Sequence, residues 1–176
     1  MGITIHYAGK LRSREGLAAL HAIASQWAAR WRCEVVDIDD PAGELIRVHN
    51  GQVCRYRGPV TGLAVLPHAD AEPFLLQFDA DLHMQQSCKT QFAPPQVHVE
   101  IIGMLREMAP CFEALTVHDE GGYWETGDRA HLEDRLAECR ALIDKVAAHD
   151  GALIAPWVED ALSGKDRLRD PRYSPN

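Results

Sequence analysis

The fold is decided by residues 3–38, which read ITIHYAGKLRSREGLAALHAIASQWAARWRCEVVDI. A β-prone start is followed by apolar residues at intervals of three and four, the spacing of one helical face. These residues are Leu17, Leu20, Ala24, Trp27 and Trp31. The run that begins at Cys33 is typical of a second strand. The stretch therefore predicts a strand, a helix over 14–31 and another strand.

The rest of the chain adds a hairpin, further strands and two helices. Two β-prone runs flank Asn50-Gly51, a dipeptide that favours a tight hairpin turn, so a hairpin is predicted over 45–57. Pro94-Pro95 favours a helix start, and Pro110 ends that helix. We predict a break at 39–43, strands at 63–66, 74–78 and 115–117, a loop at 80–93, and helices at 94–109 and 128–148.

This order predicts an α+β fold with a ferredoxin-like split β-α-β core, an inserted β-hairpin and an extra C-terminal helix. We expect residues 1–150 to form a single domain. Residues 151–176 are predicted to form a helical turn and a polar tail. In that segment we expect Trp157 to dock on the body and the last residues to lie against its acidic surface or a second chain, as in a homodimer.

The composition is that of an ordinary globular domain, with 46% hydrophobic and 25% charged residues. The sequence shows neither a secretory signal nor an apolar run long enough to cross a bilayer, so we expect no membrane association. Five cysteines, an odd number with no Cys-x-x-Cys pair, favour reduced thiols. A cytoplasmic location is therefore expected.

The net charge of −8 disfavours a nucleic-acid partner, because phosphates require clustered Lys and Arg. The charge is uneven. Residues 33–164 are strongly acidic, whereas residues 1–32 and 165–176 carry more bases than acids. An acidic body would attract a basic partner and speed their encounter, which is one function open to this chain.

The densest polar cluster is 117–128, VHDEGGYWETGD, which begins at the end of a predicted strand and precedes a predicted helix. Loops in such positions often carry function. Tyr123 and Trp124 could stack on a planar ligand. His118, Asp119, Glu120 and Glu125 could bind a cation or move protons. The same residues could equally turn the chain and cover the edge of the core.

Scattered histidines and one cysteine give weaker candidates for chemistry. His68, His98 and His118 are the candidate metal ligands, although no local spacing brings two of them together. Cys88 lies beside Lys89, whose charge would lower a thiol pKa, and His98 or His118 could act as its base. The other four cysteines, Cys54 among them, have apolar surroundings and are expected in the core. No phosphate loop, dinucleotide fingerprint or serine-hydrolase motif occurs, and no cofactor is expected.

Residues 89–98, KTQFAPPQVH, and residues 119–128 resemble an uncharacterised bacterial protein family. The resemblance covers residues 60–147, and no activity is assigned to that family. It implies no substrate, but it draws attention to these two segments as one cleft.

The sequence therefore leaves three functions open, and whether the chain is an enzyme is undecided. The first is a binding or interaction module with a polar cleft formed by 89–98 and 118–128, which would take a small molecule or a protein. Its ligand-binding residues would be Lys89, Gln91, His98, Tyr123, Trp124 and Glu125. The second is a hydrolase-like enzyme, with or without a metal ion, that uses His98, His118 and Glu120 as catalytic residues. The third is an acidic, immunity-like protein that masks a partner.

Overall fold

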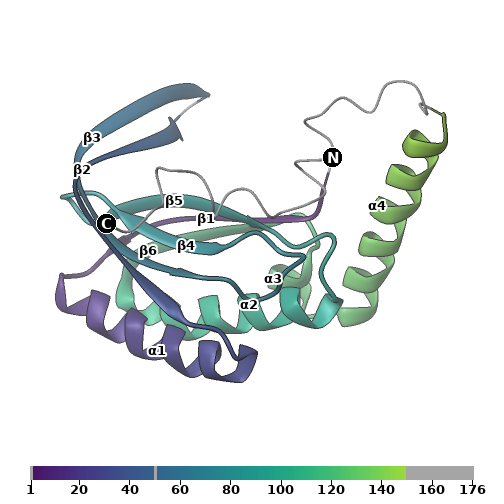
Figure 1. Cartoon of the computed structure of the whole chain (residues 1–176), viewed down its shortest axis with the longest axis horizontal. Coiled ribbons are helices and arrows are strands. Elements are labelled where there is room, and N and C mark those ends of the chain that lie inside the picture. The colour runs from purple at the N-terminus through teal and green to yellow at the C-terminus, as the bar shows by residue number, and fades with distance from the viewer. Residues whose placement is uncertain (1, 50, 150–176) are drawn as a thin grey trace.

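The computed structural model describes residues 2–49 and 51–149 (Figure 1). Its elements, in chain order, are β1 (Thr4–Leu11), α1 (Glu15–Trp31), β2 (Val35–His49), β3 (Gln52–Val65), β4 (Phe74–Phe78), β5 (His83–Lys89), α2 (Pro95–Met108), a 3-10 turn (Ala109–Cys111), β6 (Phe112–Asp119), α3 (Tyr123–Thr126) and α4 (Arg129–His149).

The strands form two antiparallel sheets, which confirms the α+β class. One sheet has the order β5-β1-β6, and the other has the order β2-β3-β4. Tyr7 of β1 links them, because its hydroxyl donates to the carbonyl oxygen of Leu75 at 2.9 Å and accepts from the Leu75 N–H at 3.2 Å. The two sheets therefore share one core.

Helices α1 and α2 lie side by side below the strands, and α4 stands at one end (Figure 1). The apolar face predicted for α1 is confirmed at its centre, since Leu20 and Ala24 are fully buried. Trp27 and Trp31 reach across to α2, where their indole N–H groups donate to Glu107 and Glu100 respectively. Helix α1 is thereby fixed between α2 and the strands.

Two predicted irregular segments prove to be strands. Residues 39–43 do not end β2 but form an irregularity between Asp40 and Gly43 within one long β2–β3 hairpin. Residues 83–89, predicted as part of a loop, form β5 against β1, with Met84 and Cys88 buried. The polar residues between them hid this strand, because only its two buried positions are apolar.

No helix in the described part of the chain is both long enough and apolar enough to span a bilayer. The interpretations of 151–176, including the docking of Trp157, concern residues outside the described part.

Candidate functional site

The two segments singled out in the sequence meet in a buried hydrogen-bonded network. His98 of α2 places Nε2 3.1 Å from the Asp119 carboxylate and Nδ1 2.7 Å from the Thr90 hydroxyl. The His98 side chain has no solvent-exposed surface. In this structure it therefore holds segments together and presents nothing to a ligand.

Asp119 is the centre of this network. Its carboxylate accepts backbone N–H groups from Gly121 at 2.7 Å, Tyr123 at 2.8 Å and Trp124 at 3.0 Å. Burial acts to raise the pKa of Asp119, but the hydrogen bond and charge of His98, with the backbone donors, outweigh it and hold this pKa below its ordinary value. The ionised carboxylate fixes the turn that leads into α3 and α4.

The three candidate catalytic residues do not share one site. Side chains alternate across a strand, so His118 at the end of β6 and Glu120 just after it point away from Asp119 and His98. His118 is exposed and stacks on His6, with ring centroids 6.0 Å apart. Glu120 accepts the N–H of Thr4 at 2.9 Å and lies 3.6 Å from His6. The sheet therefore separates His98 from His118 and Glu120.

The candidate metal ligands are also dispersed. His68 accepts the N–H of Asp70 at 3.1 Å in the loop before β4, far along the chain from the other two. Among the described residues, no three His, Cys, Asp or Glu side chains converge as a metal-binding group.

The candidate ligand-binding residues mainly serve the fold. Gln91 is buried and accepts the N–H of Ile3 at 3.1 Å, and Lys89 is half-buried at the end of β5. The rings of Tyr123 and Trp124 are half-buried, and the Arg106 guanidinium lies 5.8 and 5.5 Å from their centroids. An arginine thus already covers the proposed stacking platform.

Glu125 is the exposed member of the set, on the short helix α3.

The interpretation of the cysteines is wrong for two of them. Cys88 is fully buried, burial raises the pKa of its thiol, and Sγ donates to the Glu72 carbonyl oxygen at 3.2 Å. It cannot serve as an activated nucleophile. Cys54, expected in the core, is exposed on β3. All five cysteines are free of disulfide bonds.

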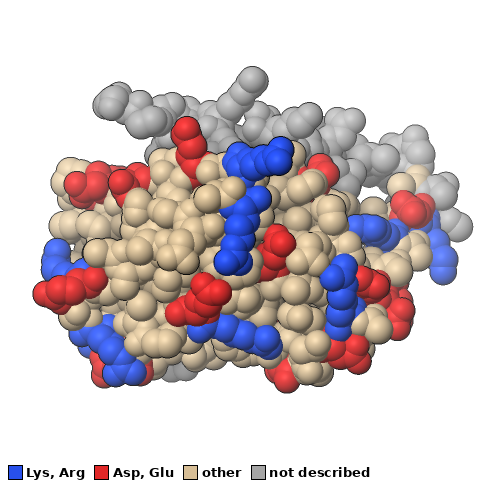
Figure 2. All heavy atoms as spheres, turned by 90° about the horizontal axis from the view of Figure 1, so that it is seen from below, with Lys and Arg blue, Asp and Glu red and all other residues tan. Residues whose placement is uncertain are grey.

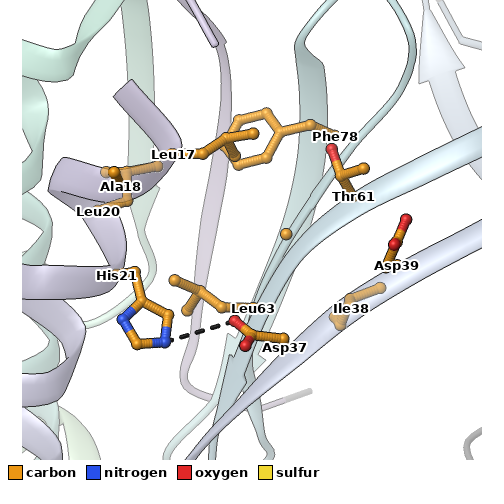
Figure 3. A pocket seen from close by; sticks show the side chains of 11 residues that line it. Leu17, Ala18, Leu20, His21, Asp37, Ile38, Asp39, Thr61, Leu63 and Phe78 are labelled. Atoms are coloured by element: carbon orange, nitrogen blue, oxygen red, sulfur yellow. Dashed lines mark ion pairs between the residues drawn. The ribbon is translucent and has the colours of Figure 1, made fainter. Parts of the chain in front are cut away.

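A different feature, a groove between α1 and the β2–β3 hairpin, is open to a ligand (Figure 3). Its volume is about 480 Å³, within the usual range for ligand-binding pockets. Buried Leu20, Leu63 and Phe78 provide an apolar floor. Asp37 and Asp39 belong to the lining and are exposed, so they form an acidic rim.

Local sequence patterns place these residues around the groove. Leu17, Leu20 and His21 follow one another at helical spacing on α1, so they face the same way. Across the groove, Asp37 pairs with Leu63 and Asp39 pairs with Thr61 in the β2–β3 register. The alternation of β2 therefore brings both carboxylates to one face of the hairpin.

Gly62 allows the hairpin to pack tightly against β4. A Cβ atom on Gly62 would lie 1.7 Å from the carbonyl oxygen of Leu76, which no side chain could tolerate. The close approach of β3 to β4 at this position therefore requires glycine.

One histidine lies within ion-pair distance of a carboxylate on the rim. His21 Nε2 lies 3.4 Å from Asp37 Oδ1, and the Asp37 side chain remains 77% exposed. Asp39 has no ion-pair partner among the described residues. The rim can therefore accept an external cation through two exposed carboxylates.

Ser25, His21 and Asp37 lie in the order of a serine-histidine-aspartate catalytic triad, but the site lacks donors that could stabilise an oxyanion. Ser25 Oγ lies 3.3 Å from His21 Nδ1. Ser25 sits inside α1, where the surrounding backbone N–H groups bond within the helix and cannot stabilise an oxyanion. The arrangement fits binding better than acyl transfer.

Sequence reasoning missed the groove, although one signal was present. The run Val36-Asp37-Ile38-Asp39 alternates apolar and charged residues, which is typical of a strand with one charged face.

No family model, curated protein or solved structure matches the chain.

Proposed function

We propose that the chain is a binding module that receives a basic, partly apolar polypeptide segment in the groove between α1 and the β2–β3 hairpin. The observation that carries this proposal is the combination of an apolar floor with an acidic rim. A Lys or Arg side chain has the matching structure, because its apolar stem can line the floor while its charged end reaches the carboxylates.

The proposal keeps the binding class expected from the sequence and moves the site. Residues 89–98 and 118–128 do meet, but His98 and Gln91 are buried at their junction. We assign these residues a positioning role, in which they hold α2 and the turn after β6 in place.

The charge distribution favours a local contact over a broad electrostatic surface. On the face formed by α1 and α2, acidic and basic side chains are interspersed (Figure 2). A partner-masking role, one of the functions open from the sequence, would then use the acidic rim of the groove.

A peptide that alternates Arg and Val is a direct probe, and a peptide that alternates Glu and Val is its control. We expect the first to bind with a dissociation constant on the order of micromolar to millimolar and to weaken as salt rises. The second should not bind. Fluorescence anisotropy of labelled peptides measures both.

Two double variants separate the rim from overall charge. Asp37→Asn with Asp39→Asn should weaken binding of the Arg-Val peptide about tenfold or more, since two charge-assisted contacts are lost. Asp134→Asn with Asp144→Asn removes the same charge from exposed positions on α4 and should leave binding within twofold. Equal effects of the two pairs would refute the groove as the site.

We also retain two broader expectations as proposals. A ferredoxin-like core is supported by the path from β5 through α2 to β6, which passes over β1 between them, and by the contacts of β4 with β5. A cytoplasmic location is supported by the five free thiols.

A further inference from the structure

The outer half of the β2–β3 hairpin is an arm that extends beyond the rest of its sheet. Strand β4 pairs with β3 only from Thr61 to Val65, so residues 44–49 and 51–57, here called the arm, lack a third strand. The arm projects from the body at the end opposite α4 (Figure 1). One of its sides contacts the body through the ion pair of Arg47 with Asp79 and through hydrogen bonds between Gln85 and the Val48 backbone.

The other side of the arm is apolar and exposed. Ile46 is 60% exposed, Val48 53% and Val53 67%. Val48 and Val53 are cross-strand partners, and Ile46 is two residues from Val48, so the three share one face. A two-stranded ribbon is marginally stable alone, and an exposed apolar face on such a ribbon favours a partner.

The same face carries positive charge near its apolar end. Arg55 lies opposite Ile46, and Arg57 lies opposite Glu44. Both arginines contact Glu44, at 2.8 and 3.3 Å, so one positive charge remains unmatched.

The acidic groove rim belongs to the same face of the hairpin. Val53, Arg55 and Arg57 alternate along β3 in phase with Thr61 and Leu63, the partners of Asp39 and Asp37. Between Asp40 and Gly43, β2 has one residue more than the facing part of β3. After this irregularity, the β2 side chains still lie on the same face as those of their β3 partners. One ribbon face is therefore acidic at its base and basic and apolar at its tip.

The two ends cannot pair within one molecule. Thr61 lies four positions after Arg57, which is about 13 Å along a strand, and a paired ribbon cannot fold back on itself. In contrast, two such faces placed antiparallel around a twofold axis bring each base against the other tip.

We propose that the chain forms a homodimer in which the arm of each copy docks on the groove of the other. Arg55 and Arg57 of one copy meet Asp37 and Asp39 of the second, and the apolar tip covers the groove mouth. This inference rests on the proposed function and names the basic segment that the groove receives.

Light scattering coupled to size-exclusion chromatography tests the proposal with the full chain. We expect a mass twice that of the 19.6 kDa chain. Arg55→Glu with Arg57→Glu should give a monomer, and Asp37→Arg with Asp39→Arg should do the same. An equimolar mixture of these two variants should form a heterodimer, because both arm-to-groove contacts again join opposite charges. All four substitutions in one chain should likewise restore the homodimer.

The control is Arg135→Glu on α4, an exposed arginine outside the arm, which should remain dimeric. Circular dichroism checks that every variant is folded. A monomeric wild type, a dimer that survives both charge reversals, or a fourfold variant that is folded but monomeric overturns the inference. A dimer built by other surfaces or by the C-terminal residues would survive both charge reversals and would be recognised in this way.

The failure of this inference is distinguishable from that of the proposed function. If the wild type is monomeric but binds the Arg-Val peptide through Asp37 and Asp39, the groove is a binding site for another molecule and the dimer is refuted. If neither the peptide nor a second copy engages these carboxylates, both proposals fail.

Discussion

Replacing Asp119 by Asn tests the buried network at its centre. The change preserves shape but replaces one carboxylate oxygen by an NH₂ group, which cannot accept. Three backbone N–H groups and His98 Nε2 now converge on this carboxylate. At least one buried donor would then lose its acceptor, and His98 would lose its charged partner.

The expected cost is about 2–4 kcal/mol in the free energy of unfolding, because a buried donor left without its acceptor costs about 1–3 kcal/mol, and more where the lost partner is charged. Urea denaturation followed by circular dichroism measures it, with a similar dependence on urea concentration in both proteins. The matched control is Asp128→Asn, because the Asp128 carboxylate accepts one N–H, from His131 at 3.1 Å, at an exposed position before α4. Asn caps helices as well as Asp does, so this change should cost about 0.5 kcal/mol or less.

A loss below about 1 kcal/mol for Asp119→Asn would refute the reasoning, since it would mean that the network contributes no more than one ordinary hydrogen bond.

Three further predictions concern pH, packing and thiol reactivity. Because the pKa of Asp119 is lower in the folded chain than in the unfolded one, its contribution to stability is present above about pH 4 and is lost as pH falls through the folded value. Urea denaturation at several acidic pH values should therefore show that the free energy of unfolding depends less on pH in Asp119→Asn than in the wild type. An unchanged dependence on pH would contradict this. Gly62→Ala should destabilise the chain by about 3 kcal/mol or more in urea denaturation, since its Cβ would meet the Leu76 carbonyl group; a loss under about 1 kcal/mol would count against the tight packing. In the native protein, Cys54 should react with a thiol reagent quickly and Cys88 only after unfolding; mass spectrometry of the labelled peptides would expose the reverse order.

The sequence patterns that proved reliable are those that depend on local periodicity. The spacing from Leu17 to Trp31 predicted α1, and Asn50-Gly51 predicted the hairpin between β2 and β3. Strand β5 was missed because its central residues are polar, and pairing with β1 stabilises it. Such pairing depends on residues about 80 positions apart, which no local window includes.

The candidate site was harder to predict because burial depends on the tertiary structure. The sequence predicted that the segments containing His98 and Asp119 lie together, and the two side chains are hydrogen-bonded. It did not indicate that the contact lies inside the protein. The groove depends on which face of β2 turns towards α1, and that is decided by the register of Asp37 and Asp39 with β3.

The central claim is that the groove between α1 and the β2–β3 hairpin binds a basic, partly apolar segment. Titration of the isotope-labelled Arg55→Glu, Arg57→Glu chain with the Arg-Val peptide, followed by amide chemical shifts in NMR spectra, tests it most directly. We predict that the largest shifts fall on residues 17–21, 37–39 and 61–63. The absence of shifts, or shifts concentrated at 89–98 and 118–128, would contradict the account.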